Sequence, residues 1–115
     1  MSYMLLIVED PAQRATRSDA EGRAVYGQMV DFGNTLKSEG LLLGVESLVS
    51  SASRVKVRSG KAQVIDGPFA EAKEMIGGFF LLDCETREEA IAVAARCPAS
   101  AWATVEVRAL GPCFM

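Results

Sequence analysis

One short stretch of the sequence, residues 66–74, brings together four ionisable side chains that could move a proton or hold a charged ligand. It reads Asp66-Gly67-Pro68-Phe69-Ala70-Glu71-Ala72-Lys73-Glu74. A buried carboxylate can act as a general base, and a lysine can hold an anionic or phenolic ligand. Asp66 and Lys73 are therefore candidate catalytic residues. Glu46 is a third, because its carboxylate stands within a predicted strand.

Each of these side chains also has a purely structural interpretation. In an Asp-Gly-Pro turn, the Asp66 carboxylate can cap its own turn by accepting backbone N–H bonds. The charges from Glu71 to Glu74 can form a solvated helical turn. If Glu46 faces the interior, it needs a basic partner such as Lys73 or Arg108, and a buried ion pair meets that need without catalysis. The sequence leaves both interpretations open.

A pocket beside these groups would take residues from neighbouring segments as well. Glu9, at the end of the first predicted strand, and Tyr26, in a predicted helix, are candidates to line it. Glu71 and Phe69 are two more, from the stretch itself. The ordinary alternatives are an exposed loop for Glu9, packing for Tyr26, and a place in the core beneath the turn for Phe69.

The composition argues against several kinds of site. The sequence has no histidine, which is the commonest general base and metal ligand. Its three cysteines (Cys84, Cys97 and Cys113) show no C-x-x-C spacing, so we expect neither a disulfide framework nor a zinc site. Cys84 ends an apolar strand and is more typical of a core thiol than of a nucleophile. We expect no metal and no other cofactor.

The net charge and the lengths of the apolar runs limit the partners and the cellular location that we expect. A net charge of -3 and a pI near 4.9 do not favour binding to nucleic acid or to a membrane surface. No apolar run is long enough to span a bilayer, and the first residues lack the basic segment of a signal peptide. We expect one cytoplasmic domain over residues 1–115, of a bacterial type.

Local signals predict where the helices and strands lie. Residues 3–8 form an apolar strand, and residues 11–17 a polar connection. A capping box at Ser18 opens a helix whose apolar face is spaced at helical intervals and which Gly40 ends. A second strand covers residues 41–49. Residues 54–58 and 61–65 form a hairpin around Ser59-Gly60, with Val55 opposite Val64.

The second half of the sequence again predicts a strand, a helix and a strand. Residues 79–82 are apolar on both faces and predict a central strand covered on both sides. A second capping box at Thr86 opens a helix that Pro98 ends, and residues 104–108 alternate as a last strand. This order predicts an α+β fold of the ferredoxin-like, split βαβ type, with two helices on one face and an inserted hairpin. We expect a homodimer packed sheet to sheet, because a second subunit would cover the other face.

Several motifs, in order along nearly the whole chain, resemble the YCII-related family in its DGPF-domain branch. They are Tyr3-Met4-Leu5-Leu6-Ile7, Gly44-Val45-Glu46-Ser47-Leu48, Val64-Ile65 with the stretch 66–74, Gly77-Gly78-Phe79-Phe80, and Val105-Glu106-Val107-Arg108. The resemblance implies a dimeric α+β barrel of ferredoxin-like subunits. Better-studied members carry a histidine and an aspartate proposed as catalytic, and this chain, without histidine, cannot use that pair. It also lacks a proline soon after Leu48.

Two functions follow from these features. The first is a small-molecule-binding or cofactor-free enzyme domain that transfers a proton, or carries out an elimination, on a small aromatic or carbonyl compound. The resemblance supports a lyase-like reaction, because one relative is a dehydrochlorinase. The alternative is a non-enzymatic interaction module, since some relatives are encoded beside extracytoplasmic-function sigma factors. The basic hairpin side chains Lys56, Arg58 and Lys61 are also typical of a solvated outer face.

Overall fold

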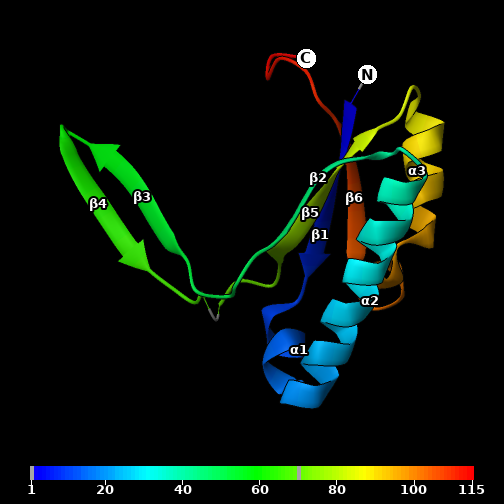
Figure 1. The fold of residues 1–115 in the computed structure, drawn as a ribbon. Coiled ribbons are helices and arrows are strands. Elements are labelled where there is room, and N and C mark those ends of the chain that lie inside the picture. The colour runs from blue at the N-terminus through cyan, green and yellow to red at the C-terminus, as the bar shows by residue number, and fades with distance from the viewer. Residues whose placement is uncertain (1, 70) are drawn as a thin grey trace.

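The computed structural model of the protein describes residues 2–69 and 71–115 (Figure 1). Ala70 of the charged stretch lies outside the described residues. The elements, in order, are β1 (Ser2–Glu9), α1 (Pro11–Thr16), α2 (Asp19–Ser38), β2 (Leu42–Ser47), β3 (Ser53–Arg58), β4 (Lys61–Asp66), β5 (Met75–Asp83), α3 (Arg87–Arg96), a 3₁₀ turn (Pro98–Ala101) and β6 (Thr104–Ala109).

Four of the strands form an antiparallel sheet in the order β2-β5-β1-β6. The first and last strands of the chain are neighbours, and β5 lies between β1 and β2, which is the split βαβ arrangement. Helices α2 and α3 cover one face of the sheet (Figure 1). The predicted ferredoxin-like α+β fold is confirmed. Within this chain the sheet is open and does not close into a barrel.

The core lies between the sheet and the helices. Side chains of β1 alternate along the strand, so Leu5 is fully buried beneath the helices while its neighbours point to the other face. Leu82 of β5 and Leu36 of α2 are equally buried. The rings of Phe32 and Phe80 meet edge to face with their centroids 5.3 Å apart. This edge-to-face contact fixes the C-terminal half of α2 on β5.

The predicted ends of α2 are confirmed at both caps. The Ser18 hydroxyl accepts the Glu21 backbone N–H, and the Glu21 carboxylate accepts the Ser18 N–H, both at 3.1 Å. These Ser18 contacts lower the pKa of the Glu21 carboxyl. At the other end Gly40 has φ of +74°, and Leu41 N–H donates to Leu36 O at 2.9 Å. This is a Schellman motif, for which glycine is best suited.

The prediction of a polar connection over residues 11–17 is wrong. Residues Pro11–Thr16 form the short helix α1. The Asp10 carboxylate accepts the Ala12 N–H at 2.9 Å, and Pro11 occupies the first turn, where its missing N–H costs nothing. An aspartate followed by a proline is thus a helix start here rather than a break.

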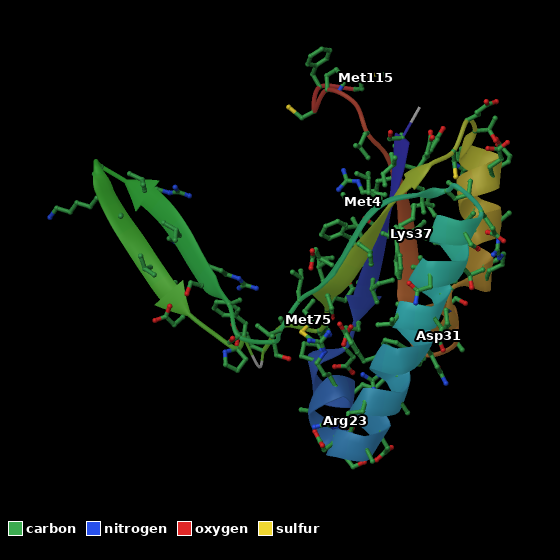
Figure 2. All side chains as sticks on the ribbon, viewed as in Figure 1. Met4, Arg23, Asp31, Lys37, Met75 and Met115 are labelled. Carbon is green, nitrogen blue, oxygen red and sulfur yellow. The ribbon has the colours of Figure 1, made fainter. Side chains whose placement is uncertain are left out.

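The sheet has a second, uncovered face. Phe80 and Leu82 are buried beneath the helices, whereas Phe79 and Leu81 point the other way and are only half-buried. Met4, opposite Leu81, lies on the same side, away from α2 (Figure 2). The prediction that residues 79–82 need cover on both sides is therefore met on one side within this chain.

Strands β3 and β4 form a hairpin of their own, apart from the main sheet (Figure 1). The predicted register is confirmed, with Val55 opposite Val64 and Val57 opposite Ala62. At the tip, Ser59 and Gly60 both have positive φ, as a two-residue hairpin turn requires. The hairpin strands pack closely only against each other. Their apolar side chains are consequently exposed.

Helix α3 lies where it was predicted, whereas its capping box and the second strand depart in part from the prediction. The Thr86 hydroxyl accepts the Glu89 N–H at 3.2 Å and caps α3, which ends just before Pro98. The Glu89 carboxylate, however, accepts from Glu85 N–H rather than from Thr86, so the second capping box is only half formed. The second strand is shorter than predicted and spans Leu42–Ser47.

Candidate functional site

A groove with a volume of about 980 Å³ separates the N-terminal half of α2 from the sheet. Only the C-terminal half of α2 buries its apolar side chains, at Phe32 and Leu36. Val25 and Met29, which lie on the same helical face, are half-buried and line the groove. The helix therefore packs on the sheet at one end and stands away from it at the other.

The walls of the groove are mostly apolar. Helix α2 contributes Val25, Tyr26, Met29 and Val30, and the sheet contributes Ile7, Leu42, Val45 and Phe80. A concave, largely apolar surface with a few polar groups is typical of small-molecule sites. Tyr26 is 58% exposed, so its hydroxyl stands at the rim.

A buried ion pair closes one end of the groove. Glu9, at the end of β1, is only 4% exposed and forms two hydrogen bonds with Arg14 of α1. Arg14 Nε lies 2.8 Å from Glu9 Oε1, and Arg14 Nη2 lies 3.0 Å from Glu9 Oε2. Two parallel bonds of this kind fix both side chains. Glu9, a pocket candidate from the sequence, does line the groove.

The remaining N–H groups of Arg14 reach segments that are distant in sequence. Nη1 donates to Leu48 O at 2.7 Å and to Ser50 Oγ at 3.4 Å, and Nη2 also approaches Gly77 O at 3.4 Å. Arg14 thus connects β1, α1, β5 and the link after β2. Because this guanidinium holds both carboxylate oxygens of Glu9, the pair has a structural role. We call the Glu9–Arg14 pair the clamp.

Gly77 makes room for the ion pair. A Cβ atom at this position would collide with the carboxylate of Glu9 and the guanidinium of Arg14. At Gly78, a Cβ would lie 2.8 Å from the backbone oxygen of Glu46. Both glycines stand in the floor of the groove because larger residues do not fit against β2 and the clamp.

A second cation lies beside the clamp. The Arg17 guanidinium stacks 4.4 Å from the centre of the Trp102 ring, and both residues line the groove. Within residues 2–69 and 71–115, no carboxylate forms an ion pair with Arg17. Its N–H donors at this end of the groove remain available to an acceptor.

The structure separates the three candidate catalytic residues. Glu46 is exposed on the outer strand β2 at the edge of the groove, but it stands opposite Phe79, so its side chain lies on the uncovered face of the sheet. Lys73 lines a smaller hollow of about 540 Å³ on the other side of Glu9, together with Asp10. Asp66 borders neither hollow. Across the part of the chain that the structure describes, no ion pair joins Lys73 to Asp66 or Glu46, so this arrangement, which the sequence left open beside a solvated turn, is not formed.

Asp66 instead fastens the base of the hairpin. Its Oδ1 accepts the hydroxyl of Ser53 at 2.6 Å. The Gly67 N–H of the turn donates to Ala52 O rather than to the Asp66 carboxylate. The peptide bond between Gly67 and Pro68 is cis.

Phe69 and Glu71 also lie at the hairpin base. The Arg54 guanidinium stacks 3.7 Å from the centre of the Phe69 ring, which is half-buried. Phe69 is not part of the buried core, so the prediction that it fills the core is wrong. Glu71 is exposed and lines neither hollow.

The two inner cysteines are core thiols. Cys84 and Cys97 are buried, and burial raises the pKa of both. A raised pKa keeps a thiol protonated and therefore a poor nucleophile. Cys113, in contrast, is exposed.

Among the described residues, no three side chains of His, Cys, Asp or Glu gather in a way that suits a metal ion. No helix in the described ranges is long and apolar enough to cross a membrane.

The family model of the YCII-related domain matches residues 1–113. The chain belongs to the YCII-related family. An uncharacterized protein of Rhizobium meliloti (strain 1021) is 32% identical to it over 93 residues, which are 79% of this chain and 75% of that protein. The predicted family resemblance is thereby confirmed.

The site of this YCII-related chain includes residues that sequence reasoning missed. Arg14 and Arg17 fall in the segment predicted to be a polar connection, and Trp102 is not among the predicted site residues. The aspartate-proline start of α1 was a local signal that would have placed Arg14 one helical turn after Asp10 and so close to Glu9. Nothing local in the sequence marks the contact between Arg14 and Leu48, which are 34 positions apart.

Replacing Gly77 by alanine tests the space under the clamp. We expect Gly77→Ala to lower the free energy of unfolding by about 3 kcal/mol or more, because the new methyl group displaces Glu9 from Arg14. The control is Gly27→Ala in α2, where no atom lies within 4 Å and alanine should stabilise the helix by about 0.5–1 kcal/mol. Urea unfolding measures both, and equal tolerance of the two changes would contradict the packing.

Removing the cation of the clamp tests the ion pair. We expect Arg14→Met to cost about 3 kcal/mol of unfolding free energy, because it leaves a buried carboxylate without a partner. The double variant Glu9→Gln/Arg14→Met should lose less than the two single variants together. As a control, Arg23→Met breaks the exposed pair with Asp19 and should cost less than about 0.5 kcal/mol. Strictly additive losses at Glu9 and Arg14 would refute the coupling.

Proposed function

We propose that this YCII-related chain is a small-molecule-binding domain and that its ligand lies in the groove between α2 and the sheet. The observation that carries the proposal is the groove itself, which has apolar walls and a polar end. A volume of about 980 Å³ falls in the range of known ligand pockets. A small aromatic or carbonyl compound matches such walls, because its flat apolar body can pack between Met29 and Phe80.

The polar end sets the orientation of the ligand. Arg14 already donates hydrogen bonds to Glu9, Leu48 and Gly77, so we do not assign it to the ligand. Arg17, which stacks on Trp102 without an ion pair among the described side chains, is the group that meets a carbonyl, phenolate or carboxylate oxygen. The ligand therefore points its oxygen toward Arg17 and its apolar part along α2.

An enzymatic form of the domain would carry out proton transfer or elimination. Its candidate base is Glu46, on the edge strand β2, whose side chain lies on the uncovered face, so a reacting ligand would have to extend around this edge of the groove. The Glu46 carboxylate would take a proton from a carbon next to the carbonyl group; the C–H electron pair forms a double bond, and a leaving group departs with its own pair. This step balances without an oxidant or a reductant. Asp66 and Lys73 remain predictions of the sequence that this groove does not use.

A second candidate function is a non-enzymatic interaction module, with a link to sigma-factor regulation as its most specific form. The observation that favours it is the projecting hairpin with its basic side chains Lys56, Arg58 and Lys61. A pull-down that depends on these three charges would support it. We also propose that the chain forms a homodimer in which a second copy lies on the uncovered sheet face. Such a homodimer fits either function.

Filling the groove tests ligand binding. A panel of small aromatic acids and carbonyl compounds is screened by the fluorescence of Trp102, the single tryptophan of the chain. We expect Val25→Phe to weaken binding at least about tenfold, because the ring occupies the ligand's volume. Ala24→Phe adds the same ring at an exposed position beside it and should bind as the wild type does. If compounds bind and both variants bind equally well, the ligand lies elsewhere.

Replacing the carboxylate of Glu46 tests the enzymatic form. For any bound compound that is turned over, we expect Glu46→Gln to lower kcat about a hundredfold or more while KM changes little. The control Glu106→Gln removes an exposed carboxylate from β6, which does not line the groove, and should leave both constants unchanged. Unchanged kcat in Glu46→Gln would exclude Glu46 as the base.

A further inference from the structure

The groove between α2 and the sheet follows the helix along most of its length. Several α2 residues that line it recur at steps of three and four positions, so they form one stripe beside the face that buries Phe32 and Leu36. The stripe carries no charge from Gly22 to Gly33, which is about 17 Å of helix. Its members are Asp19, Gly22, Tyr26, Val30, Gly33 and Lys37. The groove is therefore elongated along α2.

Both walls of the groove expose large apolar side chains to solvent. Tyr26 and Val30 of the stripe are 58% and 43% exposed, and Val45 of β2, opposite Phe80, is 40% exposed. All of them line the groove. A single aromatic ring covers about one turn of helix, whereas the uncharged part of the stripe continues for about three. Because binding free energy grows with the apolar area that is covered, an extended chain suits this surface better than a compact ring.

Most of the charged side chains around the groove are already paired or point elsewhere. The clamp is one such pair, and Asp19 accepts Arg23 Nε at 2.9 Å in another. The side chain of Glu46 lies on the uncovered face of the sheet. This leaves the cations Arg17 and Lys37, and neither forms an ion pair within residues 2–69 and 71–115. The unpaired charge that the described residues offer to the groove is therefore positive.

These two cations lie at opposite ends of α2 and differ in their surroundings. Lys37 is exposed in the last helical turn, where the helix dipole alone favours a cation. Arg17, just before the helix, is half-buried and stacks on Trp102. The indole Nε1–H of Trp102 is buried and has no hydrogen-bond partner in the part of the chain that the structure describes, although buried donors are normally paired. The Arg17 end therefore has donors that suit an acidic head group.

We propose that the ligand of this groove is an amphiphilic acid, with its carboxylate at Arg17 and a long unbranched apolar tail that runs along α2 toward Lys37. This inference rests on the proposed function, because it narrows the ligand of the same groove to one chemical class. The planar guanidinium matches a carboxylate in charge and geometry. The tail covers Tyr26, Val30 and Val45, whereas a small aromatic acid fills only the part of the groove nearest Arg17.

A series of straight-chain saturated acids tests the length of the ligand. Acids from hexanoate to tetradecanoate are titrated into the protein below the concentrations at which they form micelles, and the fluorescence of Trp102 is followed. We expect Kd to fall about fourfold for each added CH₂ group, because each group buries further apolar area. Small aromatic acids should bind more weakly than dodecanoate. An affinity that does not rise with chain length would overturn the proposal.

A charge placed within the stripe locates the tail. Val30→Glu should weaken the binding of dodecanoate at least about tenfold, because the tail would meet a carboxylate, and should change that of hexanoate, which ends short of this position, less than about twofold. The exposed position of Val30 allows the change without loss of the fold. As a control, Gln28→Glu adds the same charge to an exposed part of α2 outside the groove and should affect neither acid. Equal effects of Val30→Glu on short and long acids would contradict a tail along α2.

A matched alcohol tests the head group. Arg17→Met should weaken the binding of dodecanoate at least about tenfold and leave that of dodecanol nearly unchanged, because only the acid carries a charge for the guanidinium. Loss of acid binding in Lys37→Met instead of Arg17→Met would refute the orientation. If aromatic acids bind and the straight-chain acids bind no better, this inference fails and the proposed function stands. If neither kind of acid binds and no carbonyl compound does, both fail.

Discussion

The ion pair between Glu9 and Arg14 holds together parts of the chain that otherwise share few contacts. It joins the end of β1 to α1. Through the backbone oxygens of Leu48 and Gly77, it also joins the segment after β2 to the first half of β5. The chain therefore passes the Glu9–Arg14 pair both before and after the β3–β4 hairpin. The carboxylate is buried, so the pair tolerates no loss of either partner. Gly77 of β5 is the steric condition for it, because a side chain there would occupy the space of the pair.

The groove follows from the same arrangement. Arg14 holds α1 to the end of β1, and α2, which follows it, buries its large apolar side chains against the sheet only at Phe32 and Leu36. The space between is bounded by the apolar face that an ordinary amphipathic helix would have buried. The apolar face of α2 at Val25 and Met29 therefore lines the groove instead of the core, and Arg17 and Trp102 lie at one end of that groove.

The sequence predicted those features whose signals are local. Ser18 with Glu21 and Gly40 with its positive φ mark the ends of α2, and Ser59-Gly60 sets the hairpin register. The site was harder, because its contacts cross long stretches of sequence and depend on packing. Asp66 attracted attention by its charged neighbours, yet the contact that the structure gives it is with Ser53, thirteen positions earlier. Arg14 stood among polar residues, and only the fold shows that it reaches Leu48.

The isolation of the hairpin divides the molecule into two units with different cooperativity. The ladder between β3 and β4 joins neighbours in sequence, so it forms and opens without the sheet having to unfold. Backbone amides of Lys56 and Gln63, a hydrogen-bonded pair of the ladder, report on this local opening through hydrogen exchange, whereas those of Leu5 and Leu82 exchange only when the whole sheet unfolds. The same chain therefore has two free energies of opening. The difference between them measures how strongly the hairpin is held by whatever covers it.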